Sequence, residues 1–90
     1  MKYQIEMSTK FKNDYKLAIK RGYNDILLKE VISILASGEE LPSKYKDHTL
    51  IGDKGYRECR ITPDWLLIYR IEEDLLILAL TRTGTHSDLF

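Results

Sequence analysis

The hydrophobic pattern starts with a period of two and changes after the seventh residue. Residues 2–7 alternate between polar and apolar side chains, which predicts a half-buried β-strand. Ser8 follows and is a favourable helix N-cap, because its hydroxyl accepts a hydrogen bond from an unpaired backbone N–H. The next apolar residues recur at helical spacing, at Phe11, Tyr15, Ala18 and Ile19. A strand and then an amphipathic helix that ends before Gly22 are therefore predicted.

A second helix is predicted from the residues at its two ends. Asn24 is a suitable N-cap, and Asp25 places negative charge near the positive end of the helix dipole. Gly38 favours the left-handed conformation that closes a helix, and Pro42 cannot continue one. Between these ends runs a broad apolar stripe made of Leu27, Leu28, Val31, Ile32 and Leu35. Residues 8–38 therefore predict a helical hairpin.

The chain then changes to β-type patterning. The polar segment from Lys44 to Asp53 predicts a loop or a short strand. A strand is predicted from Gly55, with Cys59 and Ile61 directed to the core. The opposite parity of this strand holds Tyr56, Glu58 and Arg60.

Two further strands complete an antiparallel meander. Residues 65–69 are apolar at both parities, which is typical of a strand covered on both faces, and residues 75–80 form a continuous apolar run that fits a central strand. Turns are predicted at 62–64 and 72–74, where proline and acidic residues gather. Residues 81–90 are small and polar, and they predict a tail.

The element order β-α-α-β-β-β predicts an α+β fold in a single domain, residues 1–90. Two helices would pack on one face of a small, largely antiparallel sheet. The other face would remain free to present Tyr56, Glu58 and Arg60.

Composition and charge narrow the class of protein. A chain with 43% hydrophobic and 31% charged residues is not of the disordered type. The apolar runs are too short for a membrane helix, which needs about 20 residues, and the N-terminal segment lacks the apolar region of a signal peptide, so no membrane association and a cytoplasmic location are expected. The formal net charge is zero, which argues against a general nucleic-acid binder. Residues 1–21, however, carry six basic and two acidic side chains, so a local cationic surface is expected.

Candidate chemistry is concentrated in the second half of the chain. Cys59 is the only cysteine, and its parity predicts a buried residue rather than a nucleophile. His48, Cys59 and His86 are too far apart in sequence for a typical zinc motif, and the glycines lack a phosphate-loop context. Histidines with a carboxylate and arginines suit phosphodiester cleavage, which needs a base, an acid and cations for the developing negative charge. Each of these side chains alone is also typical of a solvated surface, so a small binding domain is the alternative.

Four ordered motifs, at residues 45–48, 55–59, 63–69 and 82–90, closely resemble the YafQ-type toxins of the RelE/ParE superfamily of bacterial toxin–antitoxin modules. The resemblance covers the whole chain and implies a RelE-like fold. It also implies a ribosome-dependent mRNA endoribonuclease that cuts the message in the A site and needs no metal or other cofactor. A cognate antitoxin would hold such a toxin inactive.

The resemblance also assigns functional positions. The family's functional residues match His48, Glu58, Asp64, His86 and Phe90 of this chain. We expect His86 to act as the general acid for the 5′-oxygen, and either His48 or Glu58 to accept the proton of the 2′-OH. Asp64 would orient a histidine or a base of the RNA, and Phe90 would pack beside the site or stack on a base. RNA or phosphate contacts are expected from Lys46, Arg57, Arg60 and Arg82.

Arg60 departs from the pattern, because the family commonly has histidine at this position. Arginine stays protonated, so it cannot be a general base, although it can bind phosphate. One alternative is therefore a catalytically disabled protein of this fold that only binds its antitoxin. A second alternative is a ParE-like gyrase inhibitor, because that branch shares the fold. Arg60 is either the natural residue or an attenuating change.

The resemblance implies three partners: a cognate antitoxin, the 70S ribosome and its mRNA. The first helix adds a candidate contact with ribosomal RNA through Lys10, Lys12, Lys16 and Lys20. An ordinary solvated helix face is the alternative for these lysines.

Overall fold

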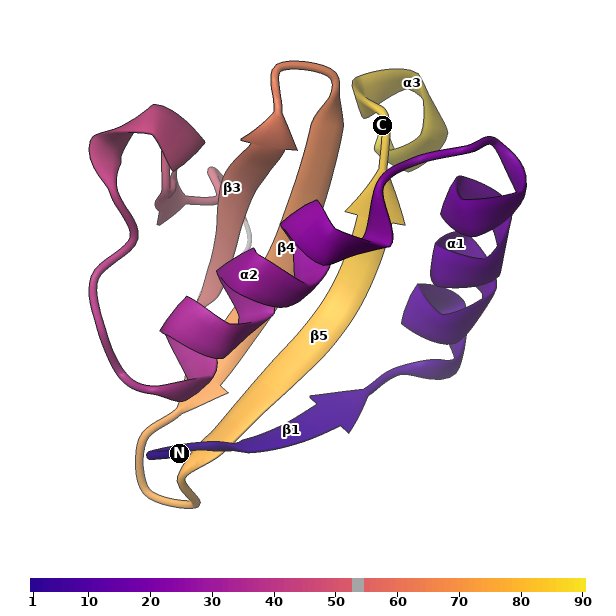
Figure 1. Cartoon of the computed structure of the whole chain (residues 1–90). Coiled ribbons are helices and arrows are strands. Elements are labelled where there is room, and N and C mark those ends of the chain that lie inside the picture. The colour runs from indigo at the N-terminus through magenta and orange to yellow at the C-terminus, as the bar shows by residue number, and fades with distance from the viewer. Residues whose placement is uncertain (53–54) are drawn as a thin grey trace.

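The structure is a computed structural model that describes residues 1–52 and 55–90, so Asp53 at the end of the predicted loop lies outside the described residues. The described part contains a five-stranded sheet in the order β1-β5-β4-β3-β2 (Figure 1). Strand β1 runs parallel to β5, and the other neighbouring pairs are antiparallel. The strands are β1 (Gln4–Met7), β2 (His48–Thr49), β3 (Tyr56–Thr62), β4 (Trp65–Glu72) and β5 (Ile77–Gly84). The predicted α+β class and the mostly antiparallel sheet are confirmed.

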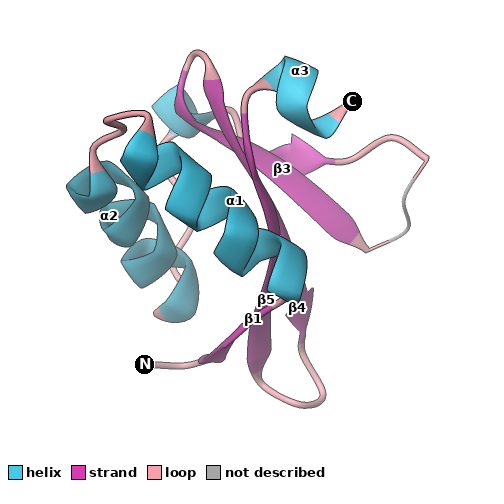
Figure 2. Cartoon of the chain, turned by 90° about the vertical axis from the view of Figure 1, so that its right-hand side faces the viewer, coloured by secondary structure: helices cyan, strands magenta, loops and turns pink. Residues whose placement is uncertain are grey.

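Two helices, α1 (Thr9–Lys20) and α2 (Asp25–Ala36), form the predicted hairpin and lie on one side of the sheet (Figure 2). Ser8 caps α1 by accepting a hydrogen bond from the backbone N–H of Phe11 at 2.9 Å. Asn24 caps α2 in the same way, with the N–H of Ile26 at 3.0 Å. Gly38, just after α2, has φ +79°, the left-handed conformation that its sequence position predicted.

The main core lies between these helices and the sheet. It contains the predicted stripe residues Leu28, Val31 and Leu35, together with Cys59 and Leu67 of the sheet. Ile19 differs from the prediction, because its side chain remains 40% exposed. Helical spacing places a residue on a face, but it does not fix where the neighbouring sheet ends. Leu17, in the same turn of α1, is likewise 43% exposed, so the end of this helix is only partly covered.

The C-terminal segment differs most from the prediction. The turn before β5 occupies residues 73–76, and Leu76 adopts a positive φ of 53°, so the strand begins at Ile77 rather than at Leu75. β5 then continues to Gly84, and a short helix α3 (His86–Leu89) follows, where a tail was predicted. Threonines pair readily along a sheet, and here Thr83 lies opposite Leu67 in β4. Partners distant in sequence therefore determine the structure of this polar segment.

The sheet face opposite the helices is less open than predicted. Glu58 is only 6% exposed, although Tyr56 and Arg60 on the same face are half-buried. The even parity of β4 is buried there too, at Leu66 and Ile68. Glu58 pairs with Ile68 across β3 and β4 and with His48 across β2, and these neighbours cover it.

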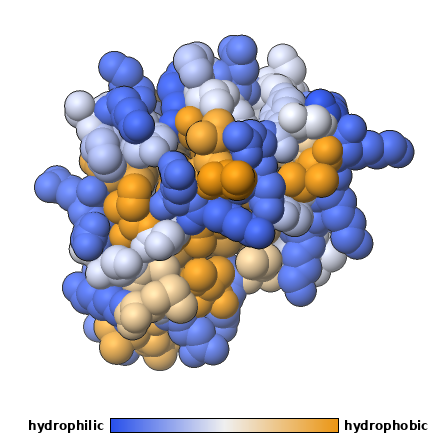
Figure 3. Space-filling view, viewed as in Figure 1, coloured by the Kyte–Doolittle hydropathy of each residue, from blue (hydrophilic) through white to orange (hydrophobic). Residues whose placement is uncertain are grey.

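The surface seen on the α2 side is mixed, with hydrophobic groups in separate patches among hydrophilic residues (Figure 3). Of the helices in residues 1–52 and 55–90, none has the length and apolar character needed to cross a membrane.

Candidate active site

The turn between β3 and β4 and the helix α3 lie at the same end of the sheet (Figure 1). Residues of this turn and of α3 line a cavity of about 550 Å³. Arg60 comes from the end of β3, Asp64 from the turn, and His86 from the start of α3. Tyr23, from the connection between α1 and α2, completes the opposite wall. Arg60 and His86 are 26 positions apart in the sequence, and Asp64 lies between them. All three predicted site residues therefore line one cavity.

Arg60 lies between this cavity and a second one. Its Nη1 donates a hydrogen bond to the carbonyl oxygen of Pro63 at 2.8 Å, which fixes the guanidinium at the base of the turn. The second cavity has a volume of about 390 Å³, and it is lined by Lys46 as well as Arg60. Lys44 adds a further cation, and Glu30 of α2 is the carboxylate of this lining. An anionic chain that passes from one cavity to the other would meet Arg60 at the junction.

His86 and Phe90 lie together at the C-terminus. Their ring centroids are 4.9 Å apart with an interplanar angle of 37°. Phe90 is still 60% exposed, so one face of its ring remains accessible to a ligand. His86 is exposed at the first position of α3, directly after the capping residue Thr85.

His48 and Glu58 form a pair on neighbouring strands. They are register partners between β2 and β3, and His48 Nε2 lies 3.4 Å from Glu58 Oε1. The other ring nitrogen, Nδ1, lies 3.0 Å from the carbonyl oxygen of Thr49, which can only accept a hydrogen bond. Nδ1 therefore carries a proton, and Nε2 is the nitrogen that faces the carboxylate. Because Glu58 and Arg60 are two positions apart on one strand, the pair lies on the same sheet face as Arg60.

Arg57 is on the other face of β3 and is engaged by Asp47. The Arg57 Nη2 to Asp47 Oδ2 distance is 3.0 Å, and Tyr69 donates its hydroxyl hydrogen bond to the same carboxylate. Burial and this hydrogen bond raise the pKa of Tyr69, so its phenol stays neutral. Asp47 thus anchors the segment that carries Lys46 and His48 to β3 and β4. Asp47 lies in the motif at residues 45–48, but no role was predicted for its side chain.

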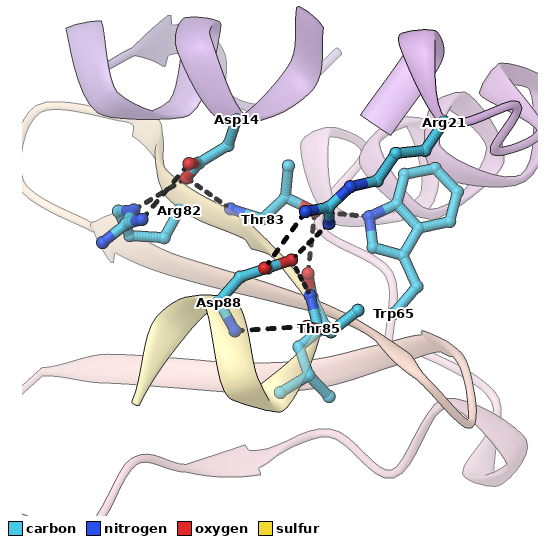
Figure 4. Close-up of polar contacts among 8 residues, drawn as sticks. Asp14, Arg21, Trp65, Arg82, Thr83, Thr85 and Asp88 are labelled. Atoms are coloured by element: carbon cyan, nitrogen blue, oxygen red, sulfur yellow. Dashed lines mark hydrogen bonds and ion pairs between the residues drawn. The ribbon is translucent and has the colours of Figure 1, made fainter. Parts of the chain in front are cut away.

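Arg82 is also held by a carboxylate, in this case Asp14 of α1. Its Nε and Nη2 lie 2.7 and 3.2 Å from the two oxygens of Asp14 (Figure 4). These hydrogen bonds to Asp14 raise the pKa of Arg82. Asp14 also accepts a hydrogen bond from the backbone N–H of Thr83 at 3.1 Å. The guanidinium of Arg82 is therefore directed toward α1, and Asp14 is a positioning residue that the sequence did not reveal.

Cys59 takes no part in this chemistry. It is fully buried, as predicted, and burial raises the pKa of its thiol to about 12. Across residues 1–52 and 55–90, no three His, Cys, Asp or Glu side chains gather as metal ligands.

Residues 3–90 of the chain match the sequence model of the YafQ family, which is described as a bacterial toxin of type II toxin–antitoxin systems. The chain belongs to this family. It is 44% identical over 88 residues to the mRNA interferase toxin YafQ of Escherichia coli strain K12, a match that covers 96% of this chain and 94% of that protein.

Solved toxin structures agree closely with the fold. A metal-bound toxin from Helicobacter pylori superposes with a TM-score of 0.94 at 44% identity, over 98% of this chain and 99% of that one. YafQ in a DinJ–YafQ complex from E. coli superposes with a TM-score of 0.91 at 42% identity, over 98% of each chain. The resemblance drawn from the four motifs is therefore confirmed at the level of family and fold.

In this YafQ-family toxin the predicted site residues fall into two groups. Arg60, Asp64 and His86 line one cavity, with Phe90 against His86 and the His48–Glu58 pair farther along the same face. Lys46 lines the adjoining cavity. The second group, Arg57 and Arg82, is held in ion pairs with Asp47 and Asp14.

Proposed function

We propose that this chain is the toxin of a type II toxin–antitoxin pair and that it cleaves mRNA on translating ribosomes, in the cytoplasm. The observation that carries this proposal is the cavity that gathers Arg60, Asp64 and His86 beside the His48–Glu58 pair. Support also comes from the E. coli relative, whose name describes an mRNA interferase.

The proposed reaction is an internal displacement at phosphorus. The 2′-oxygen of the RNA forms a bond to phosphorus while the bond from phosphorus to the 5′-oxygen breaks. One protein group takes the proton from the 2′-OH, and another gives a proton to the leaving 5′-oxygen. The products are a 2′,3′-cyclic phosphate and a 5′-hydroxyl, and no water is consumed in this step.

His86 is the proposed general acid, because it is exposed at the cavity and an imidazole exchanges protons near neutral pH. His48 and Glu58 together are the proposed base. With Nδ1 protonated, the lone pair on Nε2 of His48 can accept the 2′-OH proton, and the Glu58 carboxylate, 3.4 Å from Nε2, would stabilise the imidazolium that forms. Asp64 orients a histidine or a base of the RNA from the turn.

Arg60 is the proposed phosphate ligand, since a guanidinium offers paired donors to phosphate oxygens and this one lies between two cavities. Lys46 extends the cationic path into the second cavity. Phe90 offers its exposed ring face to a base. Ion pairs with Asp47 and Asp14 already hold Arg57 and Arg82, so we assign the direct phosphate contact to Arg60 rather than to them.

Docking on the ribosome would use the basic helix α1, whose lysines are all exposed at Lys10, Lys12, Lys16 and Lys20. Phosphate contacts of this kind make binding weaken steeply with salt concentration. A cognate antitoxin is the second proposed partner, and the E. coli structure of YafQ with DinJ supports it.

The test is an analysis of the RNA ends made in a purified translation reaction. The wild-type chain is expected to leave a 2′,3′-cyclic phosphate and a 5′-hydroxyl, and the His86→Ala variant to cut at least about 100-fold more slowly. Ser33→Ala, on the exposed side of α2, is the matched control and should cut at the wild-type rate.

A 5′-phosphate product would indicate attack by water and refute the mechanism. An unchanged rate for His86→Ala would refute the acid assignment. Equal cutting of the same RNA without ribosomes would refute ribosome dependence.

A further inference from the structure

We infer that Arg21, the C-cap residue of α1, and Asp88 of α3 are positioning residues that hold His86 at the cavity before any RNA binds. The inference concerns α3, the short helix on which His86 is the first residue. Its consequence for catalysis rests on the proposed function, whereas its consequence for the order of α3 does not.

α3 cannot be stable through its own hydrogen bonds. It has four residues, and isolated helices shorter than about 12 residues are marginal in water. Its residues are exposed or half-buried, so hydrophobic burial contributes little to holding it. Contacts with the rest of the protein must therefore determine where His86 lies.

The first contact is a capping box within α3 itself. The Thr85 hydroxyl accepts a hydrogen bond from the N–H of Asp88 at 3.2 Å, and the Asp88 carboxylate accepts one from the N–H of Thr85 at 2.9 Å. The two bonds close the turn around His86 and Ser87. They fix the internal shape of the turn, but they do not attach it to another element.

Arg21 supplies that attachment. Its Nη1 and Nη2 lie 2.7 and 3.4 Å from the two carboxylate oxygens of Asp88, so the fork of the guanidinium faces the fork of the carboxylate (Figure 4). The Oδ2 atom that accepts from Arg21 is the same atom that closes the cap with Thr85. Hydrogen bonds from Arg21 and Thr85 lower the pKa of Asp88 to about 2, so this carboxylate is charged at any physiological pH.

The strand that leads into α3 is tied to the same helix. Asp14 of α1 accepts hydrogen bonds from Arg82 and from the N–H of Thr83, and Figure 4 shows these contacts next to the Arg21–Asp88 pair. Gly84 allows α3 to lie close against this strand, since a Cβ at that position would be 3.1 Å from Cβ of Asp88. Asp14 of α1 thus holds the end of β5 before Thr85, and Arg21, at the end of the same helix, holds α3 after it.

This arrangement matters because proton transfer requires the acid within hydrogen-bond reach of the leaving oxygen. Misplacement by about 1 Å can cost about 100-fold in rate. An exposed ion pair contributes little to global stability, so the effect of losing it should appear in the position of α3 rather than in the unfolding midpoint.

The experiment compares Arg21→Gln, Asp88→Asn and the double variant with wild type. Asparagine keeps an oxygen for the cap but removes the charge that Arg21 binds. The first readout is ¹⁵N relaxation of the amides of residues 85–90 in the free protein, with Trp65 fluorescence to confirm folding. We expect increased mobility of these amides in all three variants, with the double variant no more mobile than Arg21→Gln.

The second readout is single-turnover cleavage of ribosome-bound mRNA. We expect Arg21→Gln to lower the rate at saturating toxin by about tenfold, while the half-saturating concentration changes less than twofold. Arg21→Lys, which keeps the charge but not the fork, should recover part of the rate. Lys29→Gln is the matched control, because it breaks an exposed ion pair of 2.9 Å with Asp25 on α2 and should change neither readout.

Wild-type order of residues 85–90 in Arg21→Gln would overturn the inference. A change in half-saturating concentration at an unchanged saturated rate would also overturn it, since Arg21 would then contact RNA. If the wild-type chain cuts no mRNA, the proposed function fails, and the relaxation measurement still decides whether the pair holds α3.

Discussion

Replacing Thr83 by valine tests how much the buried hydrogen bonds between β4 and β5, next to the candidate site, contribute to stability. The Thr83 hydroxyl accepts a hydrogen bond from the indole N–H of Trp65 at 2.8 Å and donates one to the carbonyl oxygen of Leu66 at 2.7 Å. Thr83 is 1% exposed and Trp65 is 2% exposed, so water cannot replace the lost partner without a rearrangement. Trp65 directly follows Asp64, and Thr83 lies three positions before His86.

The expected loss of stability follows from this geometry. Valine matches threonine in shape and suits a strand, so packing and backbone preference change little. An orphaned buried donor costs about 1–3 kcal/mol, and we therefore expect Thr83→Val to lower the free energy of unfolding by about 2 kcal/mol. For a domain of this size each kcal/mol corresponds to about 4–8 °C in Tm, so the midpoint should fall by about 8–16 °C.

Urea unfolding followed by fluorescence measures this loss directly, because Trp65 is the only tryptophan of the chain. Thr83→Ser is the control, since it keeps the hydroxyl and removes one methyl group, at a cost of about 1 kcal/mol. A Thr83→Val protein within about 0.5 kcal/mol of wild type would refute the reasoning, because the two hydrogen bonds would then have no net value.

Three other predictions concern individual groups. The Cys59 thiol, with a pKa of about 12, should not react with a thiol reagent at pH 8 in the native protein and should react fully in urea; prompt native labelling would contradict its burial. The pKa of Asp88 is lowered from 3.8 to about 2, so its stabilising contact is complete above pH 4 and is lost as the pH falls through 2; amide shifts of residues 85–90 in an acid titration should move in that window and not near pH 4. Changing Lys10, Lys12, Lys16 and Lys20 to glutamine should weaken ribosome binding and flatten its salt dependence, and an unchanged slope measured by sedimentation would remove α1 from the interface.

Local patterning predicted most of the fold. The alternation in residues 2–7, the two capped helices and the doubly apolar strand at 65–69 were all correct, because each is set by burial of nearby side chains. The segment 81–84 was not recognised as strand, since its polar threonines and arginine are paired by β4 and by Asp14 rather than by a local pattern. The same limit applied to Ile19, whose exposure depends on how far the sheet extends.

The candidate site was predicted in its residue types but not in its grouping. The motifs identified Arg60, Asp64 and His86 as candidate site residues, and the structure places them around one cavity. The partner of Arg82 was not predictable, because an ion pair between residues 68 positions apart leaves no trace in a single sequence. The buried state of Glu58 was missed for a related reason: a two-residue strand, β2, covers it.

The most direct test of the proposed activity is primer extension along an mRNA under translation in a purified system, with this chain and with its Arg60→His variant. We predict that the chain as it stands cuts at in-frame codons of the translated region, because Arg60 binds the scissile phosphate while His48, paired with Glu58, accepts the proton. Cutting by Arg60→His alone would contradict that role for Arg60, and absence of cutting by both proteins would contradict the proposed endoribonuclease.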